Sequence, residues 1–147
     1  MRAVVRGDRE ADLGVELAGA QGVLTAAGID CEVRADTGGL PAEVQSALGW
    51  VVREATTNVL RHGDAGRCAV GLSVRKGLAV LTVENDGAVA ANGDGGSGLT
   101  GLRERLAAVG GTLEAGFAGA ERDRFRLVAE VPLSTAESVT DVRGVTS

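Results

Sequence analysis

Apolar residues recur with helical spacing in three stretches of the chain. Intervals of three and four residues predict helices over residues 13–27, 41–62 and 99–109. The stripes consist of Leu13, Leu17, Ala20 and Leu24 in the first helix, of Val44, Ala47, Leu48, Val51, Val52, Ala55 and Val59 in the second, and of Leu99, Leu102, Leu106 and Val109 in the third. Each helix is therefore expected to bury one face against a common layer.

Alternating apolar and polar positions predict strands between and after these helices. The predicted strands cover residues 29–35, 67–75, 78–84, 112–115 and 125–131. The second and third are separated by Lys76-Gly77 only, which is typical of a hairpin. The order of elements predicts a two-layer α/β (α+β) sandwich, with a mixed sheet of about five strands and about three helices on one face.

Two regions lack any such pattern. Residues 85–98 have no periodicity, and the thirteen residues from Asp86 to Gly98 contain five glycines, so this loop is expected to be mobile. Residues 134–147 are polar and patternless, which predicts a disordered tail.

Composition narrows the possible partners. The 147 residues suit one domain, and the net charge of −5 without a basic run argues against nucleic acid or an anionic membrane as main partner. The sequence also lacks an apolar run of membrane-spanning length and an apolar signal-peptide core. Cys31 and Cys68 have no motif context and are expected to be reduced, buried thiols.

The second predicted helix carries polar residues that its packing does not require. Glu54 and Asn58 lie four residues apart and so on one side of the helix, and Arg61 and His62 follow at the next turn. Magnesium prefers oxygen ligands and keeps several waters, so one such side chain together with substrate phosphates can hold it. This line of residues therefore suits a hydrated magnesium ion and a polyphosphate.

Two shorter motifs are ambiguous when taken alone. Residues 96–101 match the pattern G-x-G-x-x-G, but the long loop before them argues against a dinucleotide-binding fold. Glycines that open a helix can still bring backbone N–H groups to a phosphate, and a plain surface loop is the alternative. The polar turn at residues 83–87, taken alone, is better explained as an ordinary Asx turn. The sequence has no P-loop, no protein-kinase motifs and no serine-hydrolase elbow.

Three motifs in this order resemble the ATP-binding catalytic domain of bacterial sensor histidine kinases, the GHKL superfamily with the Bergerat ATP-binding fold. Glu54-x-x-x-Asn58-x-x-Arg61-His62 looks like the N box, Asn85-Asp86-Gly87 like the first glycine box, and Gly96-x-Gly98-Leu99 like the second. The likeness runs from about residue 2 to residue 132, and is closest to the actinobacterial branch of the DesK/NarL-type kinases.

The resemblance implies roles for individual residues. Asn58 would ligate Mg²⁺ bridging the ATP phosphates, and Glu54 would be the catalytic residue that orients a metal-bound water or assists proton transfer. Arg61 and His62 would contact phosphate oxygens. The other implied nucleotide-binding residues are Asn85, Asp86 and Gly87 at the adenine, Gly96, Ser97, Gly98 and Leu99 beside the phosphates, and Thr112 on the strand beneath the nucleotide. Residues 88–97 would form the ATP lid.

The chain departs from the family pattern in the same motifs. Asn85 stands where the family has an aspartate that binds adenine, and Val89 replaces the second glycine of that box. Asp123-Arg124 replaces a Gly-Thr near the last strand. These departures keep open a degenerate nucleotide-sensing module without transfer activity, and a serine kinase of the anti-sigma-factor type is the other alternative.

The resemblance also implies different roles for different segments of the kinase. Residues 13–133 would be the catalytic domain, and residues 1–12 resemble the end of the preceding helical segment for dimerisation and phosphoacceptance. The only histidine, His62, belongs to the N box, so γ-phosphoryl transfer would go to a histidine on a separate domain. The expected partners are that phosphoacceptor domain and, indirectly, a response regulator. The expected location is the cytoplasm, either free or as the cytoplasmic part of a membrane-bound sensor.

Overall fold

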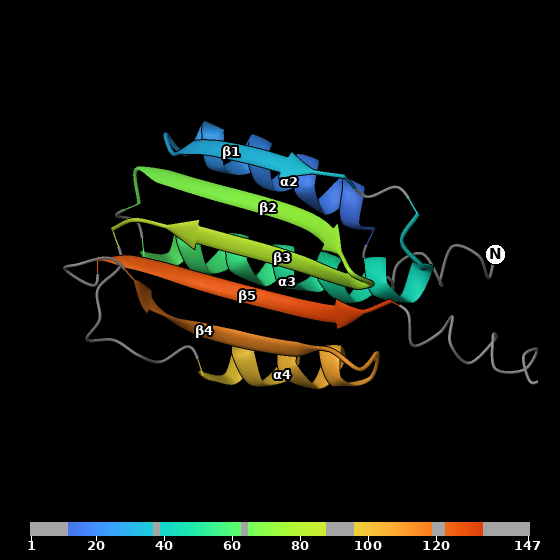
Figure 1. Cartoon of the computed structure of the whole chain (residues 1–147). Helices are drawn as coiled ribbons and strands as arrows, with labels where there is room; N and C mark the ends of the chain where they lie inside the picture. The colour runs from blue at the N-terminus through green and yellow to red at the C-terminus, as the bar shows by residue number, and fades with distance from the viewer. Residues whose placement is uncertain (1–11, 37–38, 63–64, 88–95, 119–122, 134–147) are drawn as a thin grey trace, which may run out of the picture.

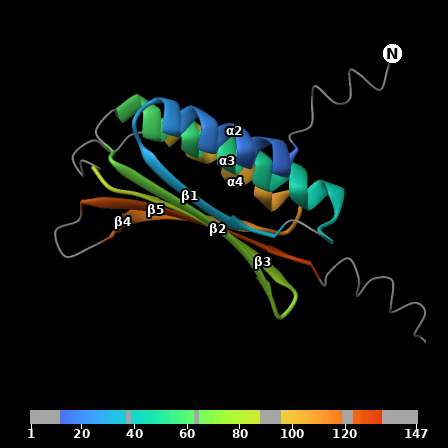
Figure 2. The same cartoon turned by 90° about the horizontal axis from the view of Figure 1, so that it is seen from above.

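The computed structural model describes residues 12–36, 39–62, 65–87, 96–118 and 123–133. The elements in chain order are α2 (Leu13–Ala26), β1 (Asp30–Ala35), α3 (Ala42–His62), β2 (Arg67–Arg75), β3 (Leu78–Asn85), α4 (Gly96–Ala107), β4 (Thr112–Ala118) and β5 (Arg124–Pro132). The predicted layers are confirmed, because the strands form one five-stranded sheet and the described helices cover one of its faces (Figures 1 and 2).

The sheet is mixed, with the strand order β1-β2-β3-β5-β4. β1 pairs in parallel with β2, and α3 forms the crossover between them, whereas all other neighbours are antiparallel. The register places Cys31 beside Cys68, Cys68 beside Asn85, and Asn85 beside Phe125. These residues therefore form one row across four strands.

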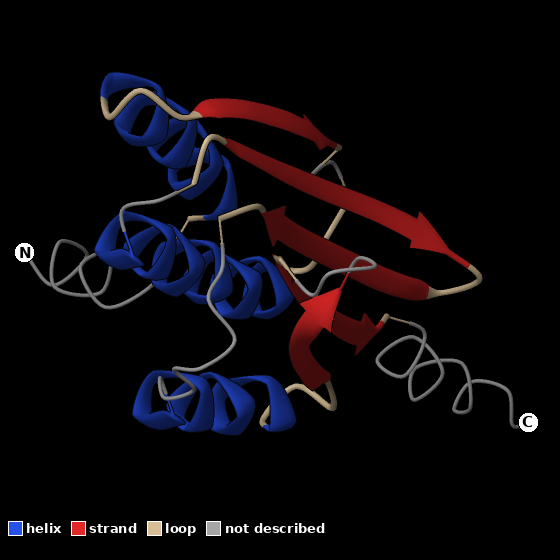
Figure 3. Cartoon of the chain, turned by 90° about the vertical axis from the view of Figure 1, so that its left-hand side faces the viewer, coloured by secondary structure: helices blue, strands red, loops and turns tan. Residues whose placement is uncertain are grey.

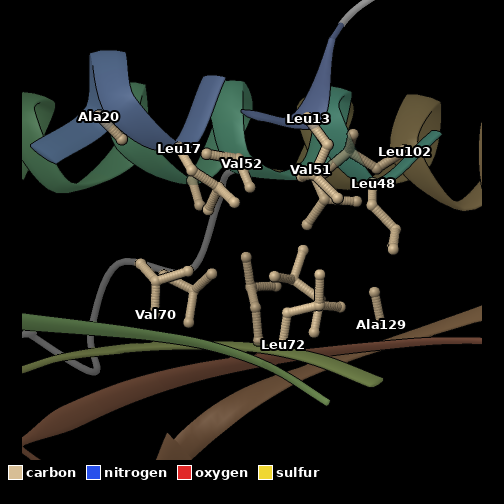
Figure 4. Packing of buried hydrophobic residues seen from close by; sticks show 14 of the residues in the cluster. Leu13, Leu17, Ala20, Leu48, Val51, Val52, Val70, Leu72, Leu102 and Ala129 are labelled. Atoms are coloured by element: carbon tan, nitrogen blue, oxygen red, sulfur yellow. The ribbon is translucent and has the colours of Figure 1, made fainter. Parts of the chain in front are cut away.

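The core lies between the helices and the inner face of the sheet (Figure 4). The predicted stripes are confirmed, because Leu13, Leu24 and Leu48 are at most 1% exposed. Every second residue of β3 is buried, as its alternating sequence requires. α3 lies between α2 and α4 and contacts both, so the three helices form a continuous layer beside the sheet (Figure 3).

Two element boundaries differ from the prediction by three residues, and the others by at most two. α4 begins at Gly96 and not at Leu99, because apolar periodicity reveals a helix only from its first apolar residue. β4 continues to Ala118 and not to Ala115, because Phe117 packs edge-on against Phe125, with ring centroids 5.4 Å apart. Residues 88–95 of the predicted lid and the predicted tail lie outside the described residues.

Three element ends meet at one end of the sheet, on the left of Figure 1. α3 and β3 both finish there, and α4 starts there and runs back antiparallel to α3. All three predicted motifs therefore reach the same end of the molecule. No helix in the described part of the chain is long and apolar enough to cross a membrane.

Candidate functional site

The polar residues of α3 lie on the side that faces α4. Trp50, Glu54 and Asn58 are spaced by four residues and form one ridge along the helix. The ring of Trp50 lies 4.1 Å from the guanidinium carbon of Arg105, which belongs to α4. The ridge therefore lies on the side of α3 that faces α4, and we refer to the region between these facing sides as the α3–α4 groove.

The polar side chains on this ridge have no partner among the residues that the structure describes. Glu54 and Asn58 are half-buried and Arg61 is exposed, yet none of them forms a hydrogen bond or ion pair within the described ranges. By contrast, the hydroxyls of Thr56 and Thr57 donate to carbonyls of their own helix. Half-buried polar groups usually have partners, so the unused groups of the ridge are available to a ligand.

The first turn of α4 lies opposite Asn58. Trp50 precedes Asn58 by eight residues, and Arg105 follows Ser97 by eight residues, which is about 12 Å of helix in each case. Since the helices are antiparallel and meet at the Trp50–Arg105 contact, Asn58 is brought level with the backbone of Gly96–Gly98. The first backbone N–H groups of a helix have no intrahelical acceptor and carry partial positive charge. His62 is the last residue of α3, and its side chain lies outside the described part of the structure.

Asn85 ends β3 on the inner face of the sheet. It is 8% exposed and is the one buried polar residue in the described part of the chain. Its Nδ2 donates to the backbone oxygen of Asp86 at 2.9 Å, whereas its Oδ1 accepts from none of the described residues. The amide is thereby held with its oxygen as the unused group.

The carboxylate of Asp86 supports the turn that follows β3. Its Oδ1 accepts from the backbone N–H groups of Gly66 at 2.7 Å and of Arg67 at 3.0 Å, and so ties the end of β3 to the start of β2. The hydrogen bond from Arg67 is the main reason that the pKa of the Asp86 carboxyl lies below its usual value, and the bond from Gly66 lowers it further. We therefore assign Asp86 to the support of the turn. Gly87 follows with φ 73°, a conformation that favours glycine.

The structure does not bring Thr112 to the other predicted residues. Thr112 is exposed on the outer face of the sheet and pairs with Glu130. Asn85 pairs with Phe125, five residues earlier along β5, which separates the two positions by about 17 Å of strand. Leu99 packs against the core beneath the first turn of α4, so its contribution to the site is structural.

A broad hollow opens beside this groove. It has a volume of about 930 Å³, and its lining includes Asn85 and Asp86 but no residue of α3 or α4. Cys31 and Cys68 also line it, and both are buried free thiols, as predicted. Burial raises the pKa of the Cys68 thiol to about 12, so at neutral pH it is protonated and unreactive. We therefore place the candidate site at the groove, which has Glu54 and Asn58, together with the part of the hollow that Asn85 lines.

Reasoning from the sequence missed the residues that join the helices. Trp50 contacts Arg53 and Arg105, and Arg53 forms an ion pair with Glu16. The spacing of four between Trp50 and Glu54 was a usable signal, because it places Trp50 on the polar ridge.

Comparison with known proteins gives relatives of one kind. No protein-family model matches the chain. The chain is 32% identical over 108 residues to the sensor histidine kinase YxjM of Bacillus subtilis, covering 70% of this chain and 26% of YxjM. It is 35% identical over 72 residues to the sensor histidine kinase DesK of the same organism, covering 47% of this chain and 20% of DesK. The chain thus spans about a quarter or less of these relatives.

Solved structures share the fold. The blue-light activated histidine kinase of Erythrobacter litoralis EL346 matches with a TM-score of 0.69 and 25% identity, over 86% of this chain and 43% of that one. The catalytic domain of histidine kinase ThkA matches with a TM-score of 0.63 over 84% of this chain and 95% of its own, and at 13% identity this likeness concerns the fold alone. Sequence similarity and fold together identify the chain as the catalytic ATP-binding domain of a two-component sensor histidine kinase, related to YxjM and DesK.

Proposed function

We propose that the groove between α3 and α4 binds Mg·ATP and presents its γ-phosphoryl group to a histidine on a separate phosphoacceptor domain. The observation that carries this proposal is the ridge of Glu54 and Asn58, which is half-buried, lacks partners in the described structure and lies level with the first turn of α4. A magnesium ion and phosphate oxygens are complementary to these groups.

Asn58 is the proposed metal ligand. The described residues hold no group of three or more His, Cys, Asp or Glu side chains placed for a metal ion. A magnesium ion in the groove would therefore be held by the oxygen of Asn58, by phosphate oxygens and by water, which is a common way to bind this ion. Arg61 and His62 at the end of α3 and the backbone N–H groups of Gly96–Gly98 would neutralise the remaining phosphate charge.

Glu54 is the proposed catalytic residue. Transfer forms a bond from the phosphorus to a nitrogen of the acceptor imidazole and breaks the bond to the β–γ bridging oxygen, which leaves with ADP. The acceptor imidazole loses a proton in the process, and a carboxylate one turn before the metal ligand can accept it, directly or through water. Most of the rate enhancement would come from positioning and charge neutralisation.

Asn85 is the proposed adenine contact. Because its Nδ2 is engaged by Asp86, the amide presents an oxygen acceptor, as the family's aspartate would. This acceptor suits the 6-amino group of adenine and opposes the 6-oxo group of guanine. The neutral amide lacks the charge of a carboxylate, so we expect moderate affinity.

The proposal is tested by calorimetric titration of the chain with Mg·ADP and Mg·ATP. We expect dissociation constants from micromolar to sub-millimolar, on the order of −8 to −5 kcal/mol, with weaker binding of Mg·GTP and with chelator present. No heat and no thermal shift up to millimolar nucleotide would favour the degenerate module and reject the proposal.

Transfer is tested separately with labelled ATP. We expect no acid-labile phosphate on this chain alone and labelling of an added phosphoacceptor domain from the same kinase. Label on His62 would contradict the assignment of this residue to the phosphates. The relatives reported above are all sensor histidine kinases, which favours histidine over serine as the acceptor.

The wider setting is proposed from the resemblance of the sequence motifs. We place the chain in the actinobacterial branch of the DesK/NarL-type kinases and in the cytoplasm. Its direct partner would be the dimerisation and phosphoacceptor domain of the same kinase, through which a response regulator is reached.

A further inference from the structure

Trp50 of α3 contacts two guanidinium groups. The guanidinium carbon of Arg53 is 4.4 Å from the ring centroid and that of Arg105 is 4.1 Å from it. Arg53 also pairs with a residue of α2 and Arg105 belongs to α4, so the indole of α3 is contacted by cations linked to both neighbouring helices. A cation over an indole face is attracted by the negative potential of the ring.

The contact extends across all three helices. Arg53 also donates to the carboxylate of Glu16 on α2 at 2.7 Å, and only 16% of the Glu16 side chain is exposed. This hydrogen bond raises the pKa of Arg53, which therefore remains a cation. Glu16, Arg53, Trp50 and Arg105 form a chain of contacts from α2 through α3 to α4.

Other described residues of α4 contact the core and the sheet. Leu102 and Leu106 bury the inner side of α4 in the core. The Nε of Arg103 donates to the backbone oxygen of Leu113 at 3.3 Å, but this bond leads to β4 and not to α3. The stacking of Arg105 on Trp50 is thus a direct side-chain link between the exposed sides of α3 and α4.

The Arg105–Trp50 contact lies where it can influence the spacing of α3 and α4 at the groove. It lies about 12 Å of helix away from both Asn58 and the first turn of α4, along two antiparallel helices. We propose that the Arg105–Trp50 contact is a positioning contact, which sets the distance between Asn58 and the first turn of α4 and thereby the affinity for the nucleotide phosphates. This inference rests on the proposed nucleotide binding.

The test is a double-mutant cycle on nucleotide affinity. Mg·ADP is titrated calorimetrically into the wild type, Arg105→Gln, Trp50→Leu and the double variant. Removing a cation–π contact at an exposed site predicts about two- to fivefold weaker binding for each single variant. Trp50→Leu removes the contacts with both Arg53 and Arg105. The double variant should therefore bind no more weakly than Trp50→Leu alone, because the Arg105–Trp50 contact is already lost in that variant.

The control is Arg75→Gln at the β2–β3 turn. Arg75 is exposed, makes no interaction with the described residues, and loses the same charge. Arg75→Gln should leave the affinity for Mg·ADP unchanged. Wild-type affinity in Arg105→Gln, or multiplied losses in the double variant, would overturn the inference. Absence of binding by the wild type would instead reject the proposed function.

A second measurement needs no change at Trp50. The chain has one tryptophan and no tyrosine, so its indole emission reports on Trp50 alone. Linkage requires that nucleotide affects the contact if the contact affects nucleotide affinity. We expect Mg·ADP to change the emission of the wild type and to have less effect on Arg105→Gln. Unchanged wild-type emission at saturating Mg·ADP would contradict the coupling.

Discussion

α2 and α3 pack side by side on the same face of the sheet but use their polar residues differently. Both bury an apolar stripe, and both contact the sheet layer. On α2, the polar side chains serve the fold: Asp12 caps the helix, Glu16 pairs with Arg53, and Gln21 donates to the backbone oxygen of Cys31. On α3, Glu54 and Asn58 form no side-chain interaction with the residues that the structure describes.

The difference separates packing from function. The apolar stripe alone would not distinguish the helices, because it reflects only the burial that both share. Half-buried polar groups without a protein partner remain accessible to water and so also to a ligand. The polar side chains of α2 are used by the fold, whereas the ridge of α3 is left unused, and this is why we propose the ligand site there.

The largest expected effect is the loss of a leucine from α2. Leu24 is 1% exposed, so Leu24→Ala should lower the free energy of unfolding by about 2–5 kcal/mol, as measured by urea denaturation. Val23→Ala, at a position 46% exposed, should cost much less. The folded fraction of Leu24→Ala should bind Mg·ADP normally. A destabilisation below about 1 kcal/mol would show that α2 is not part of the cooperative core.

The next largest effect is expected on nucleotide affinity, for a substitution in α3. Asn58→Ala should weaken the binding of Mg·ADP about ten- to 150-fold, because a hydrogen bond or ligand contact with a charged group contributes roughly 1.5–3 kcal/mol. The matched control is Gln21→Ala, which removes a carboxamide from α2 and should leave the affinity unchanged. Full magnesium dependence in Asn58→Ala would remove Asn58 from its proposed role. A comparable loss in Gln21→Ala would erase the contrast between the helices.

The sequence predicted this contrast only in part. The apolar stripes and the alternating apolar positions predicted the helices, the strands and the two layers, because these patterns depend on residues that are close in the sequence. The position of β5 between β3 and β4 follows from long-range pairing, which no local pattern encodes. The distance of Thr112 from the other predicted site residues has the same origin, because the register of β4 on β5 decides where Thr112 lies.

Neighbouring residues in one motif also proved different in role. Asn85 and Asp86 are equally polar, and the sequence offered both as adenine contacts. The structure separates them because Asn85 continues the inner face of β3, whereas the carboxylate of Asp86 meets the backbone of Gly66 and Arg67. The stacking of Arg105 on Trp50 was equally hidden, since it joins residues of two helices.

A smaller effect on stability is expected for Asp86, in the turn that follows β3. Asp86→Ala should lower the free energy of unfolding by about 1–2 kcal/mol at pH 7, because two backbone N–H groups lose a partly exposed, charged acceptor. The folded protein lowers the pKa of this carboxyl from 3.8, so the contribution is present above about pH 4 and is lost as the pH falls through the folded value.

The measurement for Asp86 is urea denaturation of both proteins across the acidic range. The stabilities of wild type and Asp86→Ala should converge toward low pH. A difference that stays constant with pH would show that the charge of Asp86 does not contribute. Asn85→Ala serves as the binding control, since it should weaken nucleotide more than Asp86→Ala does.

The smallest effect is expected at the start of α2. The Oδ1 of Asp12 accepts from the backbone N–H of Val15 at 3.1 Å and so caps the helix. Asp12→Ala should therefore cost about 1 kcal/mol in urea denaturation, and Asp12→Asn close to nothing, because asparagine caps equally well. Mg·ADP affinity should be unchanged in both. Weaker nucleotide binding by either variant would mean that α2 supports the site as well as the fold.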